Sequence, residues 1–150
     1  MRMPHHKVFT RLAPSPVHGI GVFAILPIPK NVAVFVGDYN KSQWVPANRV
    51  ERLPEPIRKL YQDYCLLRDS WYGCPVSFNA LTPACYINHS DTPNVGFGKF
   101  FYTLRDIDVG EELLADYNAF SKLYQTKERG DDSCDHNTYD HRRNQRQPGQ

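Results

Sequence analysis

Apolar and polar residues alternate, or gather in short β-branched runs, over four stretches of the chain: residues 7–12, 21–24, 32–36 and 98–104. Such short stretches are typical of strands with one buried face. Pro14 and Pro16 end the first stretch, because proline interrupts regular strand pairing. In the last stretch Phe100, Tyr102 and Leu104 share one face. The pattern predicts a mostly β protein.

The strand-like stretches are joined by two similar turns. The first is Ile28-Pro29-Lys30-Asn31, where the proline suits the start of a turn and Asn31 tolerates a left-handed backbone. The second runs from Asp106 to Glu111 and has Gly110 in the place of Asn31. Two such corners, far apart in the sequence, predict several small sheets and hairpins rather than a solenoid.

One segment has the period of a helix. Apolar residues at 57, 60, 61, 64 and 65 fall on one face, and Pro56 stands where proline often opens a helix. We expect an insertion at about residues 47–70 that contains this helix. Residues 127–150 have little to bury, so we predict a disordered polar tail after a single domain at residues 1–126.

Composition narrows the classes of protein. The chain has 150 residues, 41% of them apolar, which is enough for one domain with a core. A net charge of +2 gives no indication of direct nucleic-acid binding, and no apolar run indicates a membrane span or a signal peptide. Four cysteines without a CxxC pair are typical of reduced thiols. We therefore expect an intracellular, cytoplasmic protein; a nuclear or host-directed location is also compatible.

Glycine and polar residues cluster at three places that could carry chemistry. Gly19 and Gly21 flank Ile20 just before a strand, which indicates a tight turn or a close approach of another group. There is no GxGxxG pattern or βαβ unit, so a dinucleotide fold is not indicated. Asn88 and His89 form a polar pair among apolar residues, for which a structural role is the usual interpretation, and no second ligand stands at metal-site spacing.

The third cluster lies near the end of the predicted domain. Glu111 and Glu112 are adjacent, so on a strand they face opposite ways and cannot act together on one atom. We expect a turn and a structural ion pair there rather than acid–base catalysis. Tyr117 follows five residues later and closes the cluster.

In this order, the Gly19–Ala24, Tyr86–Asn94 and Gly110–Tyr117 motifs resemble the signature of SET-domain protein-lysine methyltransferases. The resemblance covers about residues 8 to 120. It implies a β-clip-like fold of several small sheets, with a pseudoknot and one inserted helix. It also implies transfer of methyl groups from S-adenosylmethionine (SAM) to the ε-amine of a lysine in a protein or peptide substrate, with S-adenosylhomocysteine as product and no metal.

The resemblance assigns roles to individual residues. Tyr117 is the expected catalytic residue, whose hydroxyl orients the amine. Phe120 is expected to cover the adenine, with Tyr124 as the other candidate. The remaining expected cofactor contacts are Gly19, Ile20, Gly21, Asn88 and His89. The expected substrate-lysine channel contains Tyr86, Ala115 and Tyr72.

Ala115 departs from the family pattern, which generally has Tyr or Phe two residues before the catalytic Tyr. One hypothesis is a roomier pocket that allows two or three methyl groups on one lysine. Another is that an aromatic from elsewhere, such as Tyr72 or Tyr86, fills the space. Two further alternatives stay open: a catalytically degenerate module that binds a peptide or the cofactor, and a homodimer that completes the substrate groove.

Overall fold

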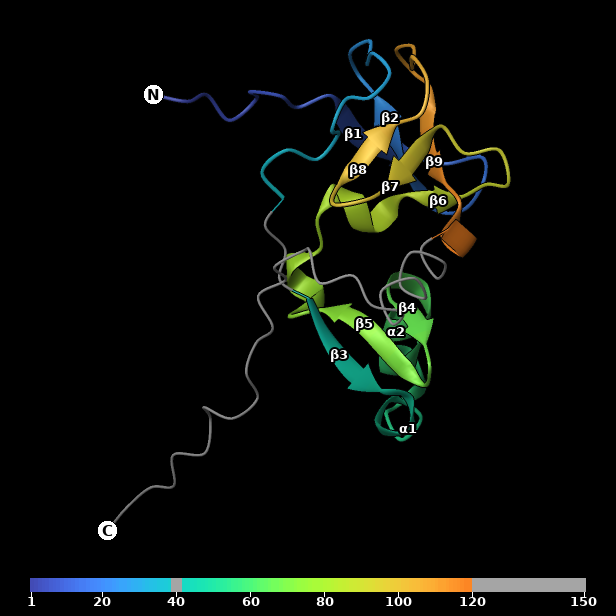
Figure 1. The fold of residues 1–150 in the computed structure, drawn as a ribbon. Coiled ribbons are helices and arrows are strands. Elements are labelled where there is room, and N and C mark those ends of the chain that lie inside the picture. Colours follow the sequence, from blue (N-terminus) through green and yellow to red (C-terminus); the bar gives the residue numbers. More distant parts are fainter. Residues whose placement is uncertain (39–41, 120–150) are drawn as a thin grey trace, which may run out of the picture.

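The structure is a computed structural model that describes residues 1–38 and 42–119. Figure 1 shows two lobes joined by short segments. The larger lobe holds a sheet in the order β1-β2-β9-β7-β8, with β6 also paired to β9. Its strands are β1 (Thr10–Pro14), β2 (Ile20–Ala24), β6 (Asn88–His89), β7 (Val95–Phe97), β8 (Phe101–Thr103) and β9 (Glu112–Ala115). The mostly β fold of small sheets is therefore confirmed.

The smaller lobe includes the predicted insertion at residues 47–70, but it extends from Ser42 to Pro75 and contains strands as well as helices. It contains a sheet in the order β3-β5-β4. Its elements are β3 (Ser42–Pro46), α1 (Ala47–Val50), α2 (Glu55–Tyr64), β4 (Leu66–Arg68) and β5 (Trp71–Pro75). Pro56 lies in the first turn of α2, where its missing N–H costs nothing. Tyr61 of α2 packs edge-on against Tyr72 and Phe78, which attaches the helix to the sheet.

The two predicted turns meet each other. Ile28 and Ile107 form an antiparallel bridge with two hydrogen bonds of 2.9 Å, and both side chains are buried. Asn31 and Gly110 both have positive φ, as the turn chemistry predicts. Thr103 is fully buried and donates through its hydroxyl to the carbonyl oxygen of Pro29, 2.6 Å away, so the first turn is tied to β8.

Three strand predictions need correction. Pro14 is the last residue of β1 and pairs with Ile20, because a strand end needs no donor from proline. Residues 32–36 form only a bridge at Ala33 beside β8, not a regular strand. Residues 98–100 are the bend between β7 and β8, so the strand predicted at 98–104 covers only Phe101–Thr103.

The last strand is enclosed by earlier parts of the chain. β9 pairs antiparallel with β2 and parallel with both β6 and β7. Asn94 is buried between these strands; its Nδ2 donates to the Glu112 carbonyl oxygen and its Oδ1 accepts from the Leu114 N–H, both at 2.8 Å. The chain after β6 thus wraps around β9, which is the interleaving expected of a pseudoknot.

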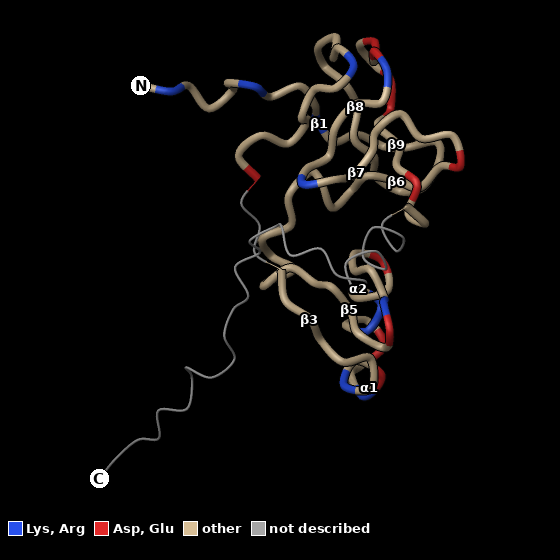
Figure 2. The backbone as a smooth tube through the Cα atoms, in the orientation of Figure 1, with Lys and Arg blue, Asp and Glu red and all other residues tan. Residues whose placement is uncertain are grey.

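Charge is distributed in small groups of both signs. In Figure 2, basic and acidic residues lie close together along α2 and at the tips of the two turns of the larger lobe. Within the described part of the chain, no helix is both long and apolar enough to cross a bilayer. Two predictions fall on residues that are not described: the Phe120 contact, with its alternative Tyr124, and the tail at 127–150 lie outside the described residues.

Candidate functional site

Tyr117 follows β9 and is held at both ends. Its main-chain N–H donates to Nδ1 of His89 at 3.1 Å, and its hydroxyl donates to the carbonyl oxygen of Ile87. The centroids of the His89 and Tyr117 rings lie 5.3 Å apart. Burial raises the pKa of the Tyr117 phenol, so the hydroxyl stays protonated at neutral pH and acts as a donor.

The tautomer of His89 follows from these contacts. Because Nδ1 accepts the Tyr117 N–H, the ring proton belongs on Nε2, which lies 3.2 Å from the carboxylate of Asp91. The imidazole thus connects β6 to Tyr117, two residues beyond the end of β9. The sequence indicates a structural role for His89, and in the structure the ring accepts a hydrogen bond from the backbone of Tyr117.

Tyr117 lines two cavities. The larger has a volume of about 590 Å³ and the smaller about 220 Å³. They share one wall, formed by Gln62, Asp63, Tyr64, Cys85, Ile87 and Tyr117. Two molecules bound one in each cavity would therefore both contact Tyr117.

The larger cavity is built from backbone and polar groups. Its lining includes the segment Val17–Ile20, which leads into β2, and the neighbouring side chains of Asn88 and His89. Gly19 has φ +48°, a conformation that side chains strain against, so glycine lets the loop turn here. Asn88 donates from Nδ2 to the carbonyl oxygens of His18, at 2.9 Å, and Ile20, at 3.3 Å, which ties this loop to β6.

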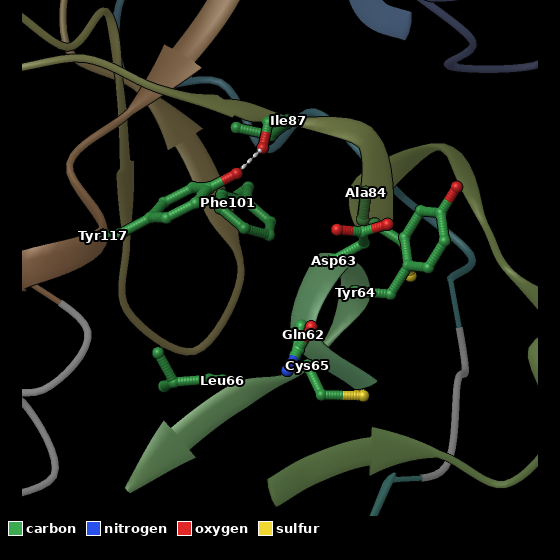
Figure 3. A pocket seen from close by; sticks show the side chains of 10 residues that line it. Gln62, Asp63, Tyr64, Cys65, Leu66, Ala84, Ile87, Phe101 and Tyr117 are labelled. Atoms are coloured by element: carbon green, nitrogen blue, oxygen red, sulfur yellow. Dashed lines mark hydrogen bonds between the residues drawn. The ribbon is translucent and has the colours of Figure 1, made fainter. Parts of the chain in front are cut away.

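The smaller cavity lies between the end of α2 and β8. Figure 3 shows Tyr117 and Phe101 together on one side, with Gln62, Cys65 and Leu66 across from them. Phe101 is held edge-on by Phe35 at 5.7 Å and tilted against Phe97 at 4.9 Å, measured between ring centroids. The wall beside the phenol of Tyr117 is therefore aromatic and fixed by packing.

Cys65, one of the two cysteines that line the smaller cavity, is not an activated nucleophile. A hydrogen bond to Cys74 and burial raise the pKa of Cys65, and the same hydrogen bond lowers the pKa of the Cys74 thiol, which is buried away from solvent. A nucleophilic cysteine needs an accessible thiolate. Within residues 1–38 and 42–119, no three His, Cys, Asp or Glu side chains lie together as metal ligands would.

The structure brings most of the predicted site residues together. Those lining the larger cavity are Gly19, Ile20, Tyr86, Asn88, His89 and Tyr117. Gly21 is buried in β2 directly behind the loop. Ala115 is buried in the core and lines neither cavity around Tyr117, and Tyr72 packs on Tyr61 instead. Tyr86 lines only the larger of the two cavities, so none of the three residues expected in the substrate-lysine channel lines the smaller cavity.

Sequence reasoning missed Phe101 and the acidic Asp63, which lines both cavities. The alternation at 98–104 contains the signal for Phe101: Phe100 and Tyr102 share the exposed face, so the residue between them points inward. Asp63 has no comparable signal, because it lies on the polar side of α2 and forms an ion pair with Lys59 at 2.9 Å.

The carboxylates near the end of the domain have separate structural roles, as expected. Glu111 forms a two-pronged ion pair with Arg105 at 3.0 and 3.1 Å. Glu112, on the other side of the strand, accepts from the Ser15 hydroxyl and the Asn88 amide. Glu111 and Glu112 thus do not form a carboxylate pair for acid–base work. The site offers a protonated phenol between two cavities, which suits group transfer between two bound molecules.

Comparison with protein families gives a match over residues 19–118 to the model described as the SET domain. That range begins at the glycine loop, ends just after Tyr117 and covers two thirds of the chain. A search of curated protein sequences gave no match.

Solved structures resemble the fold. A candidate histone methyltransferase of Plasmodium falciparum is 21% identical over 73% of this chain and 93% of that chain, with a TM-score of 0.47. A humanized mutant of Chaetomium thermophilum Polycomb Repressive Complex 2 with a bound inhibitor is 18% identical over 73% of this chain and 15% of that chain, with a TM-score of 0.48. An unliganded ctPRC2 chain mutated in Ezh2 is 18% identical over 80% of this chain and 16% of that chain, with a TM-score of 0.54.

Proposed function

Because the chain belongs to the SET-domain family, whose methyltransferases generally use SAM, we propose that it transfers methyl groups from SAM to the ε-amine of a lysine in a protein substrate. The observation that carries the proposal is the position of Tyr117, which lines both cavities and holds its hydroxyl at their shared wall. A cofactor on one side and a substrate amine on the other would meet at this phenol.

The larger cavity fits the cofactor. Its volume of about 590 Å³ lies in the range of ligand pockets, about 300–1,000 Å³. Its lining combines main-chain groups of Val17–Ile20 and polar side chains of Asn88 and His89 with the aromatic rings of Tyr64 and Tyr86. That mixture suits a ligand with an amino acid, a ribose and a base. When bound, SAM supplies a methyl group activated by its sulfonium.

The smaller cavity fits the lysine side chain. Leu66, Ile87 and Phe101 give it an apolar wall for a methylene chain, and Tyr117 stands at the side shared with the larger cavity. A free lysine amine has a pKa of about 10.4, and burial away from water favours its neutral, nucleophilic form. The carboxylate of Asp63 lines both cavities and complements the ammonium form on entry.

Tyr117 would act by positioning and polarity rather than by proton abstraction. Its raised pKa keeps the phenol neutral, so it is not a base at neutral pH. Fixing the amine in line with the methyl group is worth up to about 7–11 kcal/mol of the barrier. The Ile87 carbonyl and the phenol oxygen present partial negative charge where positive charge moves from sulfur to nitrogen.

The alternative, a degenerate binding module, rested on Ala115. That residue is 1% exposed and packs in the core rather than at Tyr117, so its small side chain leaves the phenol and the loop before β2 in place. We therefore favour the enzyme.

The test begins with calorimetric titration of the purified chain with SAM, followed by transfer of labelled methyl to candidate proteins. We expect one-site binding at micromolar to sub-millimolar SAM. Tyr117→Phe should keep binding within a few fold and lose most transfer, while Tyr102→Phe, which removes a hydroxyl from the exposed face of β8, should keep both. No binding by the wild type at millimolar SAM would refute the proposal.

A further inference from the structure

The Glu112 side chain leaves β9 toward the start of β2. Its partners there are the Ser15 hydroxyl, at 2.7 Å from Oε1 and 2.9 Å from Oε2, and the Asn88 amide, at 2.9 Å from Oε1. Both partners are neutral donors. A carboxylate that accepts from two uncharged side chains fixes the direction in which each of them points, because it has no proton to offer in return.

Ser15, whose hydroxyl is oriented by Glu112, holds one end of the Val17–Ile20 segment that lines the larger cavity. Its hydroxyl donates to Glu112, so its lone pairs are free to accept the main-chain N–H groups of Val17, at 2.9 Å, and His18, at 3.2 Å. The N–H of Ser15 itself donates to the Gly19 carbonyl oxygen at 2.8 Å. The loop is thereby closed into a compact turn over its first half.

Asn88, whose amide is also bonded to Glu112, holds the other end of the Val17–Ile20 segment. Its Nδ2 group donates to the carbonyl oxygens of His18 and Ile20 as well as to Glu112. Because the carboxylate and both carbonyl oxygens can only accept, the NH₂ group and not the amide oxygen faces all three, and Glu112 reinforces this orientation. Two side chains that both contact Glu112 therefore hold the N–H and C=O groups of the same four-residue loop.

Gly21 makes room for this arrangement. A Cβ at position 21 would lie 2.1 Å from Oε1 and 2.8 Å from Cδ of Glu112. Real Cβ atoms do not approach so closely, so the carboxylate occupies space that exists only because residue 21 is glycine. Glycine is required at position 21 because the Glu112 carboxylate lies there, not because the backbone has a positive φ.

From these contacts we infer that Glu112 is a positioning residue for cofactor binding: it shapes the Val17–Ile20 wall of the larger cavity through Ser15 and Asn88 without touching the cofactor. The inference rests on the proposed function in that SAM is the ligand of this cavity. It assigns to Glu112 a role distinct from that of its neighbour Glu111, whose carboxylate accepts from the Arg105 guanidinium and the Asp108 N–H.

The first test compares Glu112→Gln with Glu111→Gln. Glutamine keeps the size of glutamate, but it loses the charge and one acceptor oxygen. We expect the dissociation constant and KM for SAM to rise about tenfold in Glu112→Gln, the size of one lost hydrogen bond to a charged group, with kcat at saturating SAM within about twofold. Glu111→Gln should change neither. Equal SAM affinity in wild type and Glu112→Gln, or an equal loss in both variants, would overturn the inference.

A double substitution guards against a variant that merely unfolds. Gly21→Ala should weaken SAM binding as Glu112→Gln does, because the new Cβ displaces the carboxylate. Glu112→Asp withdraws the carboxylate by one methylene, so adding it to Gly21→Ala should recover part of the affinity. If the two changes are additive, the carboxylate does not act through the space above Gly21, and the inference fails.

Amide exchange separates this inference from the proposed function. The Val17 and His18 amides should exchange faster in Glu112→Gln than in the wild type without any ligand, and unchanged exchange would refute the loop part of the inference. If the wild type itself binds no SAM, the proposed function fails and the cofactor role of Glu112 fails with it. If the wild type binds and Glu112→Gln binds equally well, only the role of Glu112 fails.

Discussion

The hydroxyl of Tyr117 donates its hydrogen bond to the main-chain carbonyl oxygen of Ile87, one residue before the Asn88–His89 pair. The same short segment also receives the backbone of Tyr117, through the His89 ring. Both ends of the tyrosine are thus bonded to residues 87–89, of which Asn88 and His89 pair in parallel with β9. The position of the phenol depends on the register between β6 and β9.

The His89 contact predicts a graded loss of activity. In His89→Asn the side-chain oxygen can take the place of Nδ1 as acceptor of the Tyr117 N–H, whereas His89→Leu has no acceptor. We expect His89→Leu to lower kcat by up to about 100-fold, the size of effect known for displacements near 1 Å, and His89→Asn to lose much less. Methyl-transfer rates at saturating SAM and substrate would measure this. Equal losses in both variants would show that ring packing, not the hydrogen bond, positions Tyr117.

If the protein methylates lysine as proposed, Phe101 should limit how many methyl groups one lysine receives. It forms the cavity wall beside Tyr117 and packs against the core cluster that contains Ala115. Phe101→Leu should widen the smaller cavity and shift products toward more highly methylated lysine. Phe100→Leu, at an exposed position one residue earlier, is the control. Mass spectra of the product peptide would decide, and an unchanged pattern in Phe101→Leu would exclude this wall as the determinant.

The same packing predicts what an aromatic at position 115 would do. Ala115 is 1% exposed, so Ala115→Phe must fit a full ring into a closed core. Overpacking of this kind costs about 1–3 kcal/mol, and we expect that loss in the free energy of unfolding measured in urea. A phenylalanine that narrows the methylation pattern without loss of stability would contradict the placement of Ala115 in the core.

The sequence predicted local structure best at residue types with strong backbone preferences. Asn31 and Gly110 predicted left-handed turn positions, and Pro56 marked the start of α2, because these residues have strong backbone preferences. The motifs around Gly19, Asn88 and Tyr117 predicted which segments would meet. The turn and helix signals are local and depend on the chemistry of one residue, whereas the meeting of the three motifs was implied by the resemblance to the SET-domain family.

What could not be predicted depends on pairing between distant segments. The bridge between Ile28 and Ile107 and the parallel pairing of β6 with β9 bring together residues far apart in the chain, and alternation does not specify partners. The role of Glu112 needed the register that places its carboxylate over Gly21. The alternation around Phe101 does not by itself show which of the two faces is buried.

The ion pair between Arg105 and Glu111 predicts a small dependence of stability on pH. The Arg105 hydrogen bond, followed by the Asp108 N–H, holds the pKa of Glu111 below its usual value. A lowered pKa in the folded state stabilises the protein above the unfolded pKa of about 4.3, and that contribution disappears as the pH falls through the lower folded pKa. Because the pair is exposed to solvent, we expect no more than about 1 kcal/mol. Urea unfolding at pH 7 and pH 3 should show a difference that is smaller in Glu111→Gln; an identical pH dependence would contradict the assignment.

Asn94 is the residue on which the enclosure of β9 most directly depends. Its amide satisfies one donor and one acceptor of the β9 backbone, at Glu112 and Leu114, and its own N–H donates to the Leu114 carbonyl oxygen at 3.1 Å. Asn94→Leu removes both side-chain bonds and leaves two buried main-chain groups unpaired, each at a cost of about 1–3 kcal/mol. Asn94→Asp keeps an acceptor for Leu114 but faces the Glu112 carbonyl with a second oxygen, so it should also destabilise, by less than Leu if it becomes protonated.

The exposed Asn79→Asp is the matched control and should change stability by less than about 0.5 kcal/mol. Urea unfolding with an unchanged m-value would assign the loss in the Asn94 variants to stability alone. Because β9 ends two residues before Tyr117, a loosened β9 should also weaken the Ile87 contact and slow methyl transfer even at temperatures where the variant is folded. A folded Asn94→Leu protein with wild-type transfer would show that Tyr117 is positioned by residues 87–89 alone, independently of the strand that precedes it.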